Sequence, residues 1–300
     1  MPIRNKVVNN LKKHSILFLF AWMILFPLIA NASKINIIAA ENFYGDIARQ
    51  IGGNNVNVSS ILFSPDQDPH LFEASTSTAI AITKAQVVIY NGIGYDSWMI
   101  KLLSSTPNPK RKIIIVSTLA HRHDGDNPHI WYDPATMRTL AHQLSTTFSA
   151  INPGKAKYYQ KNLEHFLASM SAITNKISII RKIHPNVSVT ATEPVVNYLT
   201  DALGFQMRNL RFQLSIMNSA EPSVSDVAAF QNDLKNHRVR ILFYNKQATS
   251  PIAGNMQSIA KQYKIPVIGV TETEPGGELY QNWIMNLLNK IEETLSNKIK

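Results

Sequence analysis

Two histidines each follow a proline in a loop that can direct an imidazole at a ligand. Residues 68–73 read Asp-Pro-His-Leu-Phe-Glu and contain His70, and residues 127–134 read Asn-Pro-His-Ile-Trp-Tyr-Asp-Pro and contain His129. Proline fixes the backbone immediately before each imidazole and so helps to aim it. A lone histidine is more often structural or exposed. Two such turns, both in predicted strand-end loops, instead indicate a metal site, because neutral imidazole suits zinc, copper, iron and nickel.

Two glutamates occupy comparable places in the second half of the chain. Glu193 follows a predicted strand at Val187–Ala191, and Glu272 follows another at Val267–Val270. A single glutamate near a proline is often only a solvated turn or a helix-start residue, which the helix dipole favours. Together with the histidines, however, these carboxylates make a mixed nitrogen and oxygen set whose charge of about −2 neutralises a dication. Thiolate ligands are excluded because the chain has no cysteine.

Strand-like and helical patterns alternate in the elements that must position these residues. In the first half, continuous apolar runs predict strands at residues 35–40, 56–62, 87–90 and 113–116, with helices at 43–51 and 76–84. In the second half, strands are predicted at 187–191, 240–244 and 267–270, with helices at 195–203, 224–236, 252–263 and 280–295. Such runs are typical of buried parallel strands, so we expect α/β sheets covered by helices. Ligands of open α/β sheets bind beyond the carboxyl ends of the strands, where both Pro-His turns lie.

A long helix is predicted between the two halves, from about residue 153 to Ile183. Its apolar positions recur at three-, four- and five-residue intervals, as an amphipathic helix requires: Tyr158, Leu163, Phe166, Met170, Ile173, Ile177 and Ile180. About 30 residues at 1.5 Å each would span roughly 45 Å. We expect this helix to join two α/β lobes and to hold them at a fixed separation. The alternative is one long helix packed on a single domain.

The first 32 residues have the three parts of a secretory signal. A basic start without acidic residues precedes an apolar run from Ile16 to Ile29, and Ala30-Asn31-Ala32 provides a small-residue cleavage pattern. The apolar run is shorter than the roughly 20 residues that a membrane span needs. No cysteine follows the run, so we expect a cleaved signal peptide, no lipid-modified cysteine anchor, and a mature protein free in the periplasm.

The charge of the remaining chain argues against nucleic-acid binding. The whole chain has 30 basic and 20 acidic residues, and removing the four basic residues of the signal leaves 26 against 20, a charge of +6. These charges are scattered, and no basic stripe interleaved with aromatic residues is present. We therefore expect no nucleic-acid partner.

The motifs together resemble a known family, the metal-specific solute-binding proteins of ABC importers, which are periplasmic zinc and manganese receptors. The resemblance covers essentially the whole mature chain. Five motifs carry it in the same order: residues 68–73, residues 127–134, Thr192-Glu193-Pro194, Glu221-Pro222-Ser223, and Val270-Thr271-Glu272-Thr273. It implies two α/β lobes with parallel sheets joined by a long rigid helix, with the metal site in the cleft between the lobes. The implied parts are a signal peptide at 1–32, an N-terminal lobe at 33–152, a linking helix at 153–184 and a C-terminal lobe at 185–300.

Carried over position by position, the resemblance makes His70, His129, Glu193 and Glu272 the metal ligands. The third ligand is a histidine in many zinc receptors and a glutamate in manganese receptors. The fourth is normally an aspartate, so the longer Glu272 leaves open whether Glu272, Glu274 or water completes the shell. Glu73 is a candidate to hold the second nitrogen of a ligating histidine, or else a helix-start residue. His121 and His123 are either part of a polar surface loop or an auxiliary site that gathers metal.

The resemblance implies a non-enzymatic, monomeric receptor that delivers a divalent metal ion to the membrane permease subunits of an ABC importer. Zn²⁺ is favoured, because the His-containing loop and the run Val-Thr-Glu-Thr-Glu-Pro are more like zinc receptors, and Mn²⁺ is the alternative because of Glu193. A metal-dependent hydrolase is disfavoured, since four protein ligands would nearly close the shell, whereas catalytic zinc keeps an open position. A surface adhesin is a further alternative. Because a long helix resists bending, we expect only small lobe rotations or loop movements on metal binding.

Overall fold

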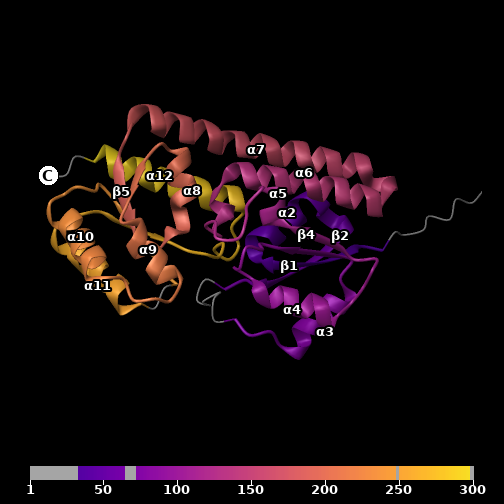
Figure 1. Cartoon of the computed structure of the whole chain (residues 1–300). Helices are drawn as coiled ribbons and strands as arrows, with labels where there is room; N and C mark the ends of the chain where they lie inside the picture. The colour runs from indigo at the N-terminus through magenta and orange to yellow at the C-terminus, as the bar shows by residue number, and fades with distance from the viewer. Residues whose placement is uncertain (1–32, 65–71, 248–249, 298–300) are drawn as a thin grey trace, which may run out of the picture. The chain divides into compact units, whose positions relative to one another are not determined.

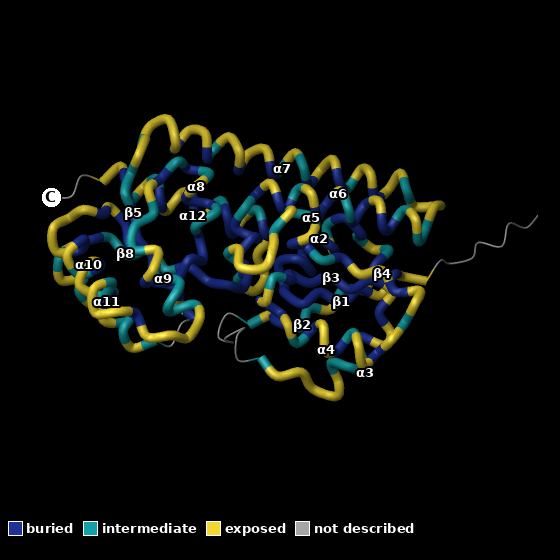
Figure 2. The backbone as a smooth tube through the Cα atoms, in the orientation of Figure 1, coloured by how far each residue is buried: buried dark blue, intermediate teal, exposed yellow. Residues whose placement is uncertain are grey.

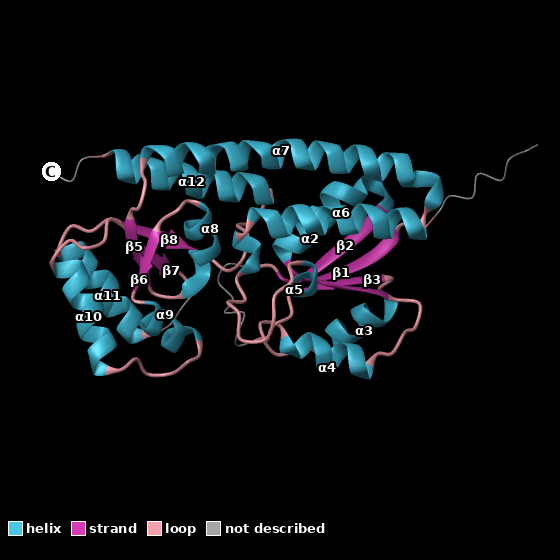
Figure 3. Ribbon diagram, turned by 45° about the horizontal axis from the view of Figure 1, so that its top comes forward, coloured by secondary structure: helices cyan, strands magenta, loops and turns pink. Residues whose placement is uncertain are grey.

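Two four-stranded parallel sheets form the framework of the computed structural model, which describes residues 33–64, 72–247 and 250–297. The first sheet has the order β2-β1-β3-β4 and contains β1 (Ile35–Glu41), β2 (Val56–Leu62), β3 (Val87–Tyr90) and β4 (Lys112–Ile115). The second has the order β6-β5-β7-β8 and contains β5 (Ser188–Ala191), β6 (Gln206–Arg208), β7 (Leu242–Asn245) and β8 (Val267–Val270). Helices flank both sheets (Figure 3). The predicted α/β class with two parallel sheets is confirmed.

Helices connect the parallel strands, as crossovers between parallel strands require. Around the first sheet lie α2 (Asn42–Gly52), α3 (Thr76–Lys84), α4 (Ser97–Ser105), α5 (Val116–Leu119) and α6 (Pro134–Ile151). Around the second lie α8 (Asn197–Ala202), α9 (Leu210–Met217), α10 (Val224–Lys235), α11 (Pro251–Gln262) and α12 (Tyr280–Ser296). Between them in the chain runs α7 (Ala156–Ile183), and among the described residues short 3₁₀ turns occur at η1 (Gly53–Asn55), η3 (Ile130–Tyr132), η4 (Pro153–Lys155) and η5 (Pro194–Val196).

Strand β1 shows how helices on both faces of the first sheet favour an almost continuously apolar strand. Ile35, Ile37 and Ala39 belong to the main core, together with residues of α2 and α6. Ile38 and Ala40 belong to a second cluster with residues of α3 and α4 on the opposite face. Successive strand residues point to opposite faces, so a strand covered on both sides buries nearly all its positions, and in β1 Asn36 alone is exposed.

Helix α7 confirms the predicted long helix and corrects its apolar stripe. The buried positions are Tyr159, Leu163, Phe166, Met170, Ile173, Ile177 and Ile180, which alternate strictly between spacings of four and three. Tyr158, which we predicted for the stripe, is 38% exposed; its neighbour Tyr159 continues the spacing and is buried. The opposite side of α7 is exposed along its length (Figure 2).

Helix α7 contacts elements from both halves of the chain. It packs against α6 and α2 beside the first sheet and against α12 beside the second (Figure 1). One continuous apolar core includes Ile37 of the first sheet, Met170 of α7 and Ile268 of the second sheet. The long helix is therefore anchored in a core that both sheets share.

Among the described helices and strands, α4, α5, β6 and α9 were not predicted from the sequence. Strand β6 has only three residues, Gln206–Arg208, none of them fully buried, so it lacks the apolar run of the other strands. Strand β4 is also shifted by one residue, because Val116 begins α5 and does not end the strand. In the described part of the chain, no helix has the length and apolarity needed to cross a membrane.

Candidate metal centre

His129 is completely buried and held in one orientation. It immediately precedes η3, and its Nδ1 lies 2.6 Å from Asn127 Oδ1. The amide of Asn127 is oriented by a bond of 2.6 Å from its Nδ2 to the carbonyl oxygen of Pro194. With Asn127 Oδ1 as an acceptor, the hydrogen of the neutral imidazole resides on Nδ1 and the lone pair on Nε2. Nε2 accordingly presents a metal-binding lone pair.

The free nitrogen of His129 faces a carboxylate across the site. His129 Nε2 has no hydrogen-bond partner among the described residues, and Glu272 Oε2 lies 3.5 Å from it. Buried polar atoms are nearly always satisfied, so an unbonded buried nitrogen points to a ligand. A cation bound by both side chains would satisfy Nε2.

Glu272 is buried on the loop after β8, and three side chains hold it. Asn245 Nδ2 donates to Oε1 at 2.7 Å, and the hydroxyl of Tyr95 donates to Oε2 at 3.0 Å. The backbone N–H of Glu272 donates to Gln247 Oε1 at 2.6 Å. Burial first, and then the Glu272 carboxylate, raise the pKa of Tyr95 well above its ordinary value, so this hydroxyl remains a donor.

Glu193 lies at the end of β5, next to the group that orients Asn127. It is 5% exposed and precedes Pro194, the first residue of η5. Thr192, the residue before it, accepts a hydrogen bond of 3.1 Å from the backbone of Asn245, which in turn holds Glu272. The loops after β5, β7 and β8 are therefore connected at one edge of the second sheet.

Not all the predicted ligands fall in the described part of the chain. His70 lies outside the described residues, as do Asp68 and Pro69. Within residues 33–64, 72–247 and 250–297, no three or more His, Cys, Asp or Glu side chains group closely enough to hold a metal ion. His129 and Glu272 form a pair, and a complete shell needs further donors.

Glu274 lies in a different environment from Glu272. Its backbone oxygen and N–H both bond to the side chain of Asn42, at 2.6 and 3.0 Å. Burial, and then the charge of Asp46, raise the pKa of Glu274 to about 9. A carboxyl that is protonated at neutral pH is a poor ligand, which favours Glu272 among the alternatives for the fourth position.

The other residues singled out in the sequence lie at the surface. His121 and His123 are exposed on a turn after α5, where Arg122 stacks over the ring of Tyr198 at 4.4 Å. Glu73 is exposed. The second ring nitrogen of His129 contacts Asn127 and not Glu73. The sequence reasoning also missed Tyr95, Asn245 and Gln247, whose positions carry no local signal of a site.

The loop that carries Glu272 is bonded to elements around the first sheet. Tyr132 donates from its hydroxyl to the carbonyl of Thr271 at 2.8 Å, and the backbone N–H of Tyr280 donates to Asp46 Oδ2 at 3.0 Å. With the bonds from Tyr95 and Asn42, the segment 271–280 is tied to α2, to η3 and to the turn after β3. The candidate site therefore draws on both halves of the chain.

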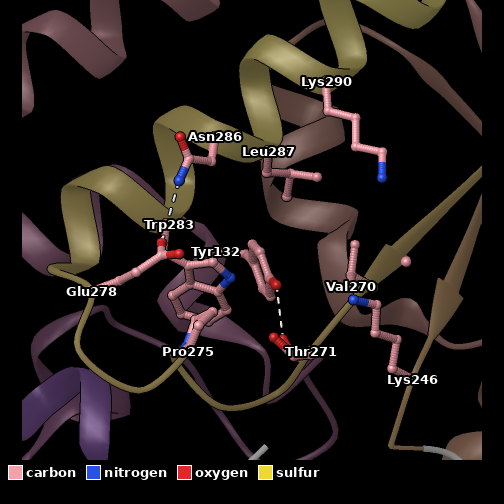
Figure 4. A pocket seen from close by; sticks show the side chains of 11 residues that line it. Tyr132, Lys246, Val270, Thr271, Pro275, Glu278, Trp283, Asn286, Leu287 and Lys290 are labelled. Carbon is pink, nitrogen blue, oxygen red and sulfur yellow. Dashed lines mark hydrogen bonds between the residues drawn. The ribbon is translucent and has the colours of Figure 1, made fainter.

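A small pocket lies behind the same loop, but its lining does not suit a cation. It has a volume of about 200 Å³, with Val270 and Thr271 on one side and Trp283 of α12 on the other. Figure 4 shows Lys246 and Lys290 at this pocket. Two ammonium groups repel a dication, so this pocket is a poorer candidate for a cation than the side of the loop where Glu272 faces His129.

Removing the side chain that orients His129 tests this geometry. We expect Asn127→Ala to weaken metal binding by roughly 10- to 100-fold, the usual effect of losing a partner that holds a ligand. Asn127→Asp keeps the acceptor oxygen and should retain more affinity. Calorimetric titration of both variants measures the effect. Equal affinity in Asn127→Ala and the unmodified chain would contradict the role of Asn127.

Comparison with known proteins gives a consistent picture. A family model described as the periplasmic component A of the zinc-uptake complex matches residues 37–294. The manganese ABC transporter substrate-binding lipoprotein PsaA of Streptococcus pneumoniae is 21% identical over 292 residues, covering 89% of this chain and 91% of PsaA. The zinc-binding lipoprotein AdcA of the same species is 21% identical over 284 residues, covering 87% of this chain. The match spans only 56% of AdcA.

Solved structures share the fold. The crystal structure of ZnuA superposes with a TM-score of 0.71 at 18% identity, covering 87% of this chain and 99% of that one. The periplasmic zinc-binding protein TroA of Treponema pallidum gives 0.72 at 15% identity, covering 88% and 100%. A cadmium-bound periplasmic metal-binding protein from Candidatus Liberibacter asiaticus gives 0.69 at 21% identity, covering 87% and 100%. At these identities the likeness shows the arrangement of the two sheets and the long helix.

Proposed function

Because this chain belongs to the family of periplasmic zinc-uptake components, we propose that His70, His129, Glu193 and Glu272 bind one Zn²⁺ ion for delivery to an importer. Members of the family are substrate-binding components of ABC metal transporters and not enzymes. The geometry of His129 is the single observation that supports the site most strongly. Asn127 holds its Nδ1, and its buried Nε2 faces Glu272 without a hydrogen-bond partner among the described residues.

The surroundings of Glu272 favour zinc over manganese. Oε1 accepts from Asn245 and Oε2 from Tyr95, so each oxygen already has a donor and one of them faces His129. This arrangement supports binding through one oxygen. Two imidazoles and two carboxylates that each bind through one oxygen would provide four ligands, which is the usual number for zinc, whereas manganese prefers a larger oxygen-rich shell.

The proposal extends to the export and assembly of the protein. We propose that residues 1–32 are a cleaved signal peptide and that the monomeric protein acts in the periplasm. The proposed parts are a lobe at 33–152, a linking helix at 153–184 and a lobe at 185–300. The bonds from Tyr95 and Tyr132 to the loop after β8 support small movements on binding. A displacement of tens of ångströms in solution scattering would contradict small movements.

Competitive calorimetry tests the function directly. We expect the chain to bind one Zn²⁺ and to bind Mn²⁺ more weakly. His70→Ala and Glu193→Ala should each weaken zinc binding at least about tenfold, since each removes a proposed ligand. Unchanged affinity in both variants would refute the four-residue site. Tighter binding of Mn²⁺ than of Zn²⁺ would assign the site to manganese.

A further inference from the structure

Glu41 is a buried carboxyl with no obvious partner at the end of β1. The residue is 0% exposed, and neither Oε1 nor Oε2 accepts a hydrogen bond from a described donor. Its strand lies between β2 and β3, and β3 leads to the turn that contains Tyr95. A buried ionised carboxylate without a donor is costly, so such a group keeps a proton or has a function.

The neighbour of Glu41 is a second carboxyl, Asp96. Adjacent parallel strands end at the same edge of a sheet, which brings Glu41 of β1 beside the turn that follows β3. The two carboxyls are close enough for each to shift the pKa of the other, and two buried carboxyls so placed are stable when they share one proton. Burial, and then the charge of Asp96, raise the pKa of Glu41 well above its ordinary value. Burial raises the pKa of Asp96 to about 6, against the opposing effect of its backbone donors.

Asp96 holds a backbone turn that is strained. Its carboxylate accepts from the N–H groups of Asn91 at 2.6 Å and Gly92 at 2.8 Å. Three successive residues of this turn have positive φ: Gly92 at 83°, Ile93 at 45° and Gly94 at 83°. A β-branched residue rarely adopts such a conformation, and strained backbone persists only where its surroundings enforce it. The Asp96 carboxylate provides that enforcement.

The turn positions His129 and Glu272. Tyr95, next to Asp96, donates to Glu272 Oε2 at 3.0 Å. Asn91 donates from Nδ2 to the carbonyl of Pro128 at 3.0 Å, immediately before His129. The pair therefore lies one residue layer behind the candidate site, outside the ligand set, and on the path that fixes His129 and Glu272.

Titratable neighbours of the pair are tyrosines and carboxyls. Tyr44 faces it from α2, Tyr90 from β3 and Tyr95 from the turn; burial is the main cause of the raised pKa of each, and the charge of Asp96 or Glu41 adds to it. Tyr280 of α12 lies beyond Tyr44, and Glu272 lies beyond Tyr95. Neither an arginine nor a lysine is among the groups that shift the pKa of Glu41 or Asp96. A dication would therefore be the dominant positive charge nearby.

We propose that Glu41 and Asp96 are a proton-sharing positioning pair that releases its proton when a divalent cation binds between His129 and Glu272. Metal capture is then linked to pH through groups that do not touch the metal. The proton passes to solvent. Glu41 and Asp96 are then both ionised, and the positive charge of the cation stabilises the two carboxylates. This inference rests on the proposed function.

The sign of the linkage follows from the raised pKa values. Burial raises the pKa of Glu41, which favours a proton on the free pair, and the cation lowers that pKa. A proton is released wherever the pH lies between the pKa values of the loaded and free forms, and the affinity rises with pH across that window. Acidic conditions therefore favour metal release.

Counting released protons tests the pair. Zn²⁺ titrations of the full chain in buffers of different ionisation enthalpy give the protons released per ion, from pH 5.5 to 7.5. Glu41→Gln replaces the protonated acid by a neutral donor that can still bond to Asp96. We expect it to release up to about one proton fewer per ion, with a correspondingly shallower rise of affinity with pH. Glu164→Gln makes the same change at the surface of α7 and should match the unmodified chain.

The outcomes separate the inference from the proposed function. Equal proton release in Glu41→Gln and the unmodified chain would overturn the inference, and absence of zinc binding to the unmodified chain would overturn the function. Protons released by Glu274 are common to both chains and cancel in the difference. If Glu41→Gln does not fold, infrared spectra of Glu274→Gln decide. A protonated-carboxyl band that disappears on adding Zn²⁺ supports the pair, and an unchanged or absent band refutes it.

Discussion

His129→Ala is expected to weaken zinc binding by on the order of 100-fold or more. Loss of a residue that merely holds a ligand costs about 10- to 100-fold, and His129 is the proposed ligand itself. The variant removes Nε2, the buried nitrogen that lies 3.5 Å from Glu272 Oε2. It also leaves Asn127 Oδ1 without its imidazole partner. Competitive calorimetric titration of the purified chain measures the loss.

His165→Ala is the matched control. His165 is exposed on α7 and is not one of the proposed ligands. The same substitution there should change the affinity by no more than about twofold, as surface substitutions usually do. Similar affinities in His129→Ala and His165→Ala would remove His129 from the site.

Trp131→Ala is expected to lower the free energy of unfolding of the metal-free chain by about 3–5 kcal/mol, the usual cost of deleting a buried large aromatic side chain. Trp131 is 0% exposed and lies directly beside the candidate site. Its ring centroid is 4.8 Å from that of Phe43, 4.9 Å from Tyr95 and 5.1 Å from His129. Urea unfolding followed by circular dichroism measures the change.

The aromatic cluster around Trp131 also explains why this loss should be large. Phe43 comes from α2 and stacks on Trp131, and Trp283 of α12 lies 6.1 Å from Phe43. The cluster therefore packs helices from both halves of the chain. Phe63→Ala serves as the control, because Phe63 is 65% exposed and its loss should cost no more than about 0.5 kcal/mol. Equal effects of the two substitutions would show that the cluster does not stabilise the fold.

Most of the fold was predictable because its signals are local. Strands β2 and β3 and helix α3 have the predicted bounds, since each is a short apolar or amphipathic run between clear ends. Helix α7 was predicted from its spacing alone, apart from the replacement of Tyr158 by Tyr159 on the buried side. Strand β6 was missed because three residues of mixed polarity have no pattern, and its pairing with β5 makes it a strand.

Some features of the candidate site were likewise predictable from the sequence, and others were not. The Pro-His turns and the strand-end glutamates were visible in the sequence because proline and residue type act within a few positions. Whether Glu272 or Glu274 faces His129 was not visible, since both lie on one short loop. Tertiary packing separates them: Asn42 and Asp46 of α2 surround Glu274, while Tyr95 and Asn245 hold Glu272.

By itself, the sequence determined the α/β class, the long helix and the residue types of a metal site. Only the tertiary structure decided which side chains orient those residues. Tyr95 and Glu272 are 177 positions apart, and Asn127 is held by a carbonyl 67 positions away. In the local sequence, Glu41 is only the residue that ends an apolar strand. It lies beside Asp96 because β1 and β3 are neighbours in the sheet. Such contacts depend on chain topology, which local patterns of polarity do not encode.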